Sequence, residues 1–200
     1  QKEIDNIIPI INCIIHPDDI LKPWAKSRNN YEWYYTFGKL LQPTSILEVG
    51  VSRGYSSVAM GLGCKIPPTQ FFLIDSELDG IPITEAIHNI QSIFQNSIIY
   101  PLISDSQVIQ ALPNNFIADI SHVDGCHSYE GVQKELALVY PCTHRYIIVD
   151  DTNVDYIAKG VEEFASSHND IQIIHRITES LTGQIILEKS SAYRMFINHS

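Results

Sequence analysis

The sequence of 200 residues predicts an α/β protein with a doubly wound, mostly parallel sheet of seven strands. Short apolar runs alternate along the chain with segments whose apolar residues recur at helical spacing. Four of these runs end in acidic residues, which would lie together if the carboxyl ends of parallel strands share one edge. We therefore expect one globular domain, residues 44–200, preceded by an N-terminal helical cap, residues 1–43.

The apolar runs give the strands in chain order. They are residues 45–50, 71–75, 98–103, 117–123, 146–151, 171–175 and 184–188. Helices are expected between them, from the first glycine turn to about residue 63 and then over 82–95, 106–112, 129–140 and 155–168. The last two strands, joined through a Thr182-Gly183 turn, are candidates for an antiparallel pair at one edge.

The segment before the first strand is crowded with aromatic residues. They are Trp24, Tyr31, Trp33, Tyr34, Tyr35 and Phe37. The main interpretation is a helical cap that packs these rings on the core. The alternative is that some of them line a substrate entrance.

Composition limits the partners. The net charge of −10 and a pI of about 5.1, without any run rich in lysine or arginine, argue against a nucleic-acid backbone and favour a small molecule. Four scattered cysteines without a C-x-x-C pair indicate neither a zinc site nor a redox motif, and favour a reducing compartment, the cytoplasm. The apolar run at 7–15 is too short to span a bilayer, so no membrane association is expected.

The most informative motif follows the first strand, where Glu48, Gly50 and Gly54 form the pattern E-x-G-x-x-x-G. Glycine lets a ligand approach the backbone, and the free N–H groups of the next helix face that ligand. The pyrophosphate fingerprint has one more glycine, and an anionic Glu48 would repel pyrophosphate but suit a ligand with an amine or a cation. The stretch resembles motif I of class I methyltransferases that use S-adenosylmethionine (SAM).

Acids end four predicted strands: Glu48, Asp75, Asp124 and the pair Asp150-Asp151. A single strand-end acid can simply cap the next helix. Four on one rim repel each other unless a cation lies between them, such as a sulfonium, an amine, a divalent metal or both kinds together. Asp75 is also placed to accept hydrogen bonds from ribose hydroxyls, a role common to nicotinamide and SAM enzymes.

The second motif is the string Asp124-Gly125-Cys126-His127-Ser128-Tyr129-Glu130-Gly131-Val132, followed by the strand that ends in Asp150-Asp151. Carboxylates on neighbouring strand ends suit Mg²⁺, Ca²⁺ or Mn²⁺. Together with the glycine turn, and over residues 40–165, the chain resembles the metal-dependent macrolide and aminocoumarin sugar O-methyltransferases and the cephalosporin-biosynthesis methyltransferase-like family.

This resemblance implies a Rossmann-like SAM-dependent O-methyltransferase that acts on a hydroxyl of a small molecule or sugar with the help of a divalent metal, Mg²⁺. It assigns the cofactor to the turn, to a ribose-binding acid, to a pair near adenine and to the fourth strand: Glu48, Gly50, Ser52, Gly54, Tyr55, Ser56, Asp75, Asp105, Ser106 and Asp124. It assigns the metal to Asp124, Asp150 and Asp151, and gives Asp124 a place in catalysis.

Cys126 departs from the family pattern, because many relatives have a second Asp there, which in some of them serves as general base. His127 is the substitute, since imidazole titrates near neutral pH; the alternative is that His127 is a structural part of the turn. His122, His144 and His175 are expected to be ordinary core or surface histidines.

Two other functions stay open. The chain is alternatively a catalytically altered relative that binds cofactor as an accessory module, for which Cys126 is the best argument. A nicotinamide oxidoreductase is disfavoured by the missing glycine and by Glu48. A homodimer would follow if the aromatic cap were exposed, but burial of these rings on the core accounts for them equally well.

Overall fold

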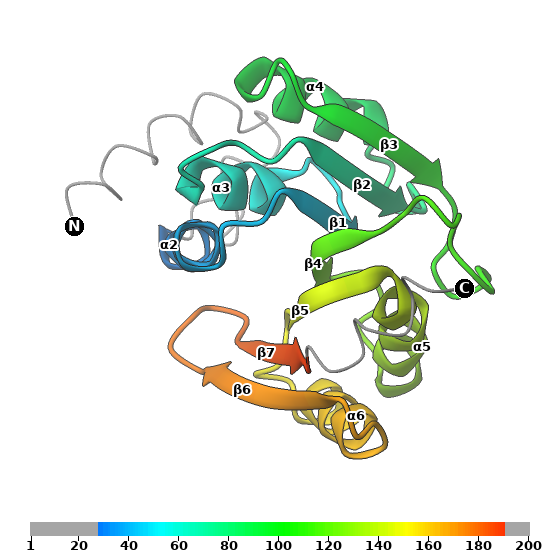
Figure 1. Ribbon diagram of the computed structural model, residues 1–200. Helices are drawn as coiled ribbons and strands as arrows, with labels where there is room; N and C mark the ends of the chain where they lie inside the picture. The colour runs from blue at the N-terminus through cyan, green and yellow to red at the C-terminus, as the bar shows by residue number, and fades with distance from the viewer. Residues whose placement is uncertain (1–27, 191–200) are drawn as a thin grey trace, which may run out of the picture.

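The computed structural model of the protein describes residues 28–190, which form one seven-stranded sheet with helices on both faces (Figure 1). The strands are β1 Ser45–Val49, β2 Gln70–Asp75, β3 Ile98–Ile103, β4 Ala118–Val123, β5 Thr143–Val149, β6 Ile171–Ile177 and β7 Gln184–Lys189. The helices are α2 Arg28–Leu41, α3 Tyr55–Gly63, α4 Ile83–Ile93, α5 Tyr129–Val139 and α6 Asp155–Ser166, with a 3₁₀ turn η2 at Tyr140–Cys142.

The strand order is β3-β2-β1-β4-β5-β7-β6. Strands β1 to β5 pair in parallel, whereas β7 pairs antiparallel with both β5 and β6. The predicted doubly wound, mostly parallel sheet is therefore confirmed, and so is the antiparallel pair at its edge. The order reverses direction between β1 and β4, which is where ligands bind in sheets of this kind.

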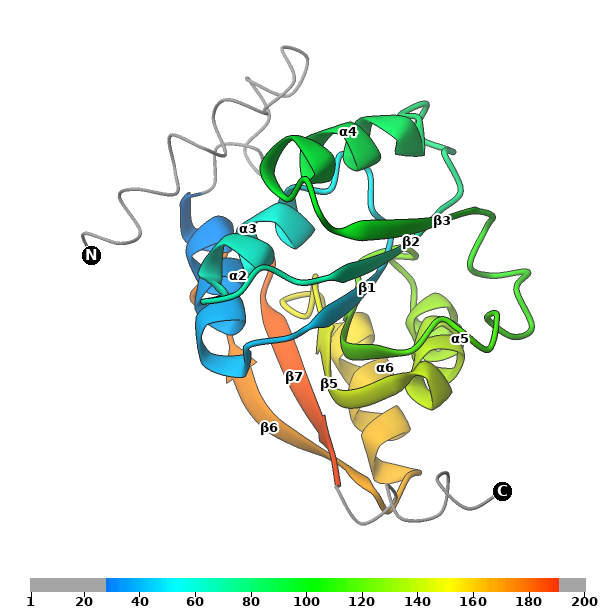
Figure 2. The same cartoon turned by 45° about the horizontal axis from the view of Figure 1, so that its top comes forward.

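Two apolar cores lie on the two faces of the sheet, because successive strand residues point to opposite sides. In β2, Phe71 packs toward α2, α3 and α4, whereas Phe72 packs toward α5 and α6. Figure 2 shows the two helical layers on either side of the strands. Strands buried on both faces read as nearly continuous apolar runs, which is why the sequence located them so well.

Helix α2 is joined closely to α3 through glycines. A Cβ atom added at Gly38 would lie 1.8 Å from the carbonyl oxygen of Met60, and one added at Gly63 would lie 2.1 Å from that of Tyr35. The rings of Tyr31, Tyr34 and Phe37 belong to the core that α2 covers. Trp24 and the rest of the predicted cap before residue 28 lie outside the described residues.

One predicted element is wrong: residues 106–112 form no helix but a turn and an irregular segment. Asp105 accepts a hydrogen bond from the backbone N–H of Gln107 at 2.8 Å, and the N–H of Val108 donates to the Asp105 carbonyl at 3.1 Å. This side-chain turn competes with helix formation, as Asp commonly does.

None of the helices within residues 28–190 has the length and the hydropathy that a membrane-spanning helix requires.

Candidate active site

A cavity of about 590 Å³ opens at the carboxyl edge of β1, β2, β4 and β5. It is lined by the glycine turn, by the loops after β2, β3, β4 and β5, by Thr182 before β7 and by helix α2. Its polar and aromatic lining residues include Tyr31, Tyr34, Ser52, Arg53, Tyr55, Ser56, Asp75, Asp79, Asp105, Ser106, Asp124, Cys126, His127, Asp150, Asp151 and Thr182.

The glycine turn needs its glycines for backbone reasons. Gly50 and Gly54 have φ angles of 79° and 71°, in the left-handed region that glycine adopts without strain. A Cβ at Gly50 would also lie 2.1 Å from the carbonyl oxygen of Asp124, so the turn is packed directly against the end of β4. The two motifs that are far apart in sequence therefore meet at this point.

Asp75 ends β2 and is held by the backbone. Its Oδ2 accepts a hydrogen bond from the N–H of Ser52 at 2.8 Å, and its Oδ1 accepts one from the N–H of Glu77 at 2.7 Å. Each carboxylate oxygen has a second lone pair, so Asp75 keeps capacity for further donors in the cavity that it lines. A fixed carboxylate beside the turn is a suitable acceptor for a pair of ribose hydroxyls.

Glu48 lies elsewhere than the sequence suggested. It is buried beneath the turn, is absent from the cavity lining, and accepts hydrogen bonds from the hydroxyls of Ser56 and Ser57 at the start of α3. Its Oε1 is also 2.9 Å from Nδ1 of His122. Glu48 therefore anchors α3 and β4 from below, where its carboxylate is not available to a ligand in the cavity.

His122 is the centre of a buried hydrogen-bond chain. Its Nε2 lies 3.1 Å from the hydroxyl oxygen of Tyr34, and that hydroxyl donates to Oδ2 of Asp150 at 2.5 Å. Because the single proton of Tyr34 is given to Asp150, Nε2 of His122 must be the donor to Tyr34. Nδ1 must donate to the carboxylate of Glu48, so both ring nitrogens carry protons and His122 is a cation.

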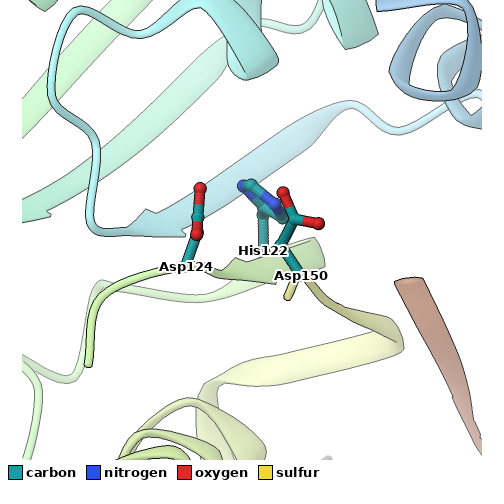
Figure 3. A group of neighbouring side chains, drawn as sticks. All are labelled: His122, Asp124 and Asp150. Carbon is teal, nitrogen blue, oxygen red and sulfur yellow. The ribbon is translucent and has the colours of Figure 1, made fainter. Parts of the chain in front are cut away.

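The electrostatics agree with this assignment. Burial alone would lower the pKa of His122, but its hydrogen bond to Glu48 and the charges of Glu48, Asp124 and Asp150 raise that pKa to about 9. Burial and the charge of Asp150 raise the pKa of Tyr34 well above its usual value, so Tyr34 stays a neutral donor. Figure 3 shows His122, Asp124 and Asp150 directed into the same space from β4 and the end of β5.

A second histidine, His127, lies between the carboxylates of Asp124 and Asp151. Nε2 of His127 is 3.1 Å from Oδ2 of Asp151 and 3.5 Å from Oδ1 of Asp124. The hydrogen bond to Asp124, opposed by partial burial and reinforced by the charges of Asp124 and Asp151, raises the pKa of His127 to about 9. Burial and the charge of Asp150 raise the pKa of Asp124 to about 7.

Among the aspartates Asp124, Asp150 and Asp151, Asp150 accepts the most hydrogen bonds. Its Oδ1 accepts from the backbone N–H of Asp151 at 2.9 Å, from the amide of Gln184 at 2.8 Å and from the hydroxyl of Thr182. Tyr34 supplies the donor to Oδ2. The carboxylate is thus fixed in orientation by the chain, and Oδ2 retains one lone pair.

Solved methyltransferases share this architecture. The O-methyltransferase from Bacillus cereus, solved with S-adenosylhomocysteine (SAH), has a TM-score of 0.62 at 13% identity, over 95% of this chain and 91% of that chain. TomG of Streptomyces achromogenes, an O-methyltransferase solved with SAM, has a TM-score of 0.60 at 15% identity, over 95% and 90%. SAH-bound PaMTH1 of Podospora anserina has a TM-score of 0.63 at 12% identity, over 93% and 88%.

The chain has the Rossmann-like methyltransferase fold. No family model matches it, and no curated protein is similar to it in sequence. In this methyltransferase fold the cavity joins a glycine turn with a fixed acid, Asp75, to a cluster of three aspartates.

The strand-end acids do not all meet at one place, and histidines supply positive charge between those that do. Asp124, Asp150 and Asp151 are brought together, whereas Asp75 stays with the glycine turn and Glu48 lies below it. The positive charge between the carboxylates comes from His122 and His127. Ligand atoms of Asp124, Asp150 and His122 lie within 4.8 Å of one another, and so do those of Asp124, Asp151 and His127. Because a protonated histidine has no lone pair to offer, the carboxylate oxygens of the three aspartates are the donors that suit a divalent cation.

Three site residues were missed or undervalued in the sequence. The sequence pattern predicts an ordinary histidine at His122, although this residue stands two positions before Asp124 and so shares its side of the strand. Tyr34 was weighed only as one of the cap aromatics. Glu135 of α5 is fully buried and accepts from the hydroxyl of Ser106 at 2.6 Å, beneath the loops that line the cavity. Its position three residues after Val132, on the apolar face of α5, was the available signal.

Proposed function

We propose that this protein is a SAM-dependent methyltransferase that transfers a methyl group to a hydroxyl oxygen of a small molecule or sugar. The observation that carries the proposal is a single cavity with two unlike halves, the glycine turn with Asp75 and the carboxylate cluster around His127. In a chain with the methyltransferase fold, the first half suits a nucleoside donor and the second suits a polar acceptor.

The donor half would bind SAM through the residues that line it. Asp75 would accept the ribose hydroxyls, Asp105 and Ser106 would lie toward adenine, and the turn would hold the methionine portion. SAM supplies a methyl group made electrophilic by its sulfonium. The main task of the protein is then to hold the donor methyl and the acceptor oxygen in line, since little further chemistry is needed.

The acceptor half would hold a divalent metal, Mg²⁺, through Asp124, Asp150 and Asp151. Support comes from the donor set, because Asp124 shares one group of close ligand atoms with Asp150 and another with Asp151, and carboxylate oxygens are ligands that Mg²⁺ prefers. Such an ion lowers the pKa of a hydroxyl that it contacts. The chain itself fixes Asp150 in orientation and places Asp124 at the junction with the glycine turn.

His127 is the candidate proton acceptor. It lines the cavity and its side chain is 59% exposed, so an acceptor hydroxyl can reach it. Its raised pKa of about 9 means that only a minor neutral fraction can take a proton at pH 7.

Cys126 supports a second candidate function, a cofactor-binding module without turnover. Its thiol lies 3.5 Å from the hydroxyl of Ser128, at the position where the family that the sequence resembles has an acid.

Methyl transfer to a panel of sugars and vicinal diols, followed by mass spectrometry, separates these two functions. An enzyme gives a product that is heavier by one methylene group, whereas a binding module gives none.

Asp150→Ala is expected to lose Mn²⁺ binding and turnover but to keep SAH binding. Full activity in excess chelator would contradict the metal assignment and leave the methyltransferase assignment intact.

We also propose the compartment in which the protein acts and the charge of its acceptor. The free thiols of Cys64, Cys126 and Cys142 among the described residues support a reducing compartment such as the cytoplasm. Six aspartates line the cavity against the basic groups of Arg53 and His127, and Arg53 is already paired with Glu85. This balance favours a neutral acceptor over an anionic one.

A further inference from the structure

Tyr34 brings helix α2 into contact with the acid cluster. Its side chain is only 3% exposed, yet it lines the cavity and its hydroxyl touches both Asp150 and His122. The ring is fixed by edge contacts with Phe37 and His122, at centroid distances of 6.1 Å and 5.0 Å. The hydroxyl therefore has a defined position that comes from α2 and not from the sheet.

A continuous chain of hydrogen bonds leads from α3 to this hydroxyl. Ser56 and Ser57 donate to Glu48, His122 donates to Glu48 and to Tyr34, and Tyr34 donates to Asp150. The hydroxyl of Tyr34 gives its single proton to Asp150, so it can only accept from the nitrogen of His122. The Tyr34 hydroxyl is thus the one link in this chain between His122 and Asp150.

We propose that Tyr34 is a positioning residue of the acceptor half: it fixes Oδ2 of Asp150 so that the remaining lone pair of that oxygen faces the cation site. The inference rests on the proposed function, because it assigns Tyr34 a role toward the divalent metal. Residues that orient a ligating carboxylate affect metal affinity strongly even though they do not touch the ion. Helix α2 is then a working part of the site as well as a cap.

Tyr34→Phe removes the hydroxyl and keeps the ring, so it isolates this role from packing. We expect the variant to bind Mn²⁺ about tenfold more weakly than the wild type, the lower limit typical of residues that orient metal ligands. SAH binding should be unchanged, because Tyr34 is hydrogen-bonded on the acceptor side only. Tyr100→Phe is the matched control, since Tyr100 stacks on Phe72 in the core and does not line the cavity.

The measurement is a titration of each protein with Mn²⁺, followed by the electron paramagnetic resonance signal of the free ion, with SAH binding measured by calorimetry. Weaker Mn²⁺ binding in Tyr34→Phe alone, with methyl transfer restored by excess Mn²⁺, supports the inference. Equal Mn²⁺ affinity in Tyr34→Phe and wild type overturns the inference and leaves the proposed function standing. A wild type that binds SAH but no Mn²⁺ refutes the metal assignment, and this inference with it.

A second variant keeps the test decisive if Tyr34→Phe does not fold. Thr182, half-buried in the loop before β7, donates another hydroxyl hydrogen bond to Asp150. Thr182→Val removes this donor and keeps a side chain of similar shape. If hydrogen-bond donors orient Asp150 for the ion, Thr182→Val also weakens Mn²⁺ binding and spares SAH. Unchanged Mn²⁺ binding in that variant would overturn the inference.

Discussion

His122 and His127 place positive charge between carboxylates that would otherwise repel each other at the strand ends. His122 pairs with Glu48 in the core and contacts Asp150 through the hydroxyl of Tyr34, and His127 lies between Asp124 and Asp151 at the cavity surface. The two differ in access: His122 is 1% exposed, whereas His127 is 59% exposed. His122 is therefore suited to hold structure, and His127 to exchange a proton.

Stability of the ligand-free protein should fall as pH rises from 6.5 to 9. The pKa of His127 is about 9 in the fold against an ordinary 6.5, so the folded state holds the proton more tightly. Its contribution is complete below pH 6.5 and is lost through pH 9. His122, with a pKa of about 9, contributes to the same fall. We therefore expect His127→Gln to make the fall in melting temperature over this range less steep without removing it, and the exposed His175→Gln to leave it unchanged. An equally steep fall in both variants would contradict the assignment.

Glu48→Gln tests where that acid acts. The change removes the negative partner of buried His122, so we expect a loss of about 3 kcal/mol in the free energy of unfolding, as for other broken buried ion pairs. SAH affinity should change little, because Glu48 does not line the cavity. Urea denaturation and calorimetry measure the two effects, with exposed Glu130→Gln as control. A large loss of SAH affinity at unchanged stability would instead restore the direct contact predicted from sequence.

At the scale of elements, how much the sequence predicts depends on where an element is buried. The strands could be located because β2 and the second half of β5 are buried and apolar on both faces, and β3 tolerates Pro101 because it is an edge strand. The helix predicted over residues 106–112 is wrong because a hydrogen bond to the side chain of Asp105 favours a turn there. The donors to Asp150 could not be predicted, since Tyr34 and Gln184 come from distant elements and meet it only through tertiary packing.

Gly38→Ala tests the close contact of α2 with α3. The added methyl would overlap the carbonyl of Met60, so the helices must separate, at a cost of about 1–3 kcal/mol typical of overpacking. Because Tyr34 is on the same helix, Mn²⁺ affinity should fall with it. Leu40→Ala, at a position 72% exposed, is the control and should change neither stability nor metal binding. Wild-type stability in Gly38→Ala would show that α2 is not held as described.

At the scale of the whole molecule, two motifs that are distant in the sequence meet across the switch point of the sheet. Gly50 lies against the backbone of Asp124, so the turn and the acid cluster form two walls of one cavity. A ligand held by Asp75 at one end and by the aspartate cluster at the other would fill both halves. This arrangement makes cofactor binding the central claim, because the acceptor half has no methyl donor without it.

The most direct test is calorimetric titration of SAH into the wild type and into Asp75→Ala. The wild type should bind with a dissociation constant in the micromolar range, and loss of hydrogen bonds to a charged group should weaken binding at least about tenfold in the variant. Circular dichroism of Asp75→Ala checks that its fold is intact. A wild type that gives no heat of binding with SAH or SAM would contradict the account.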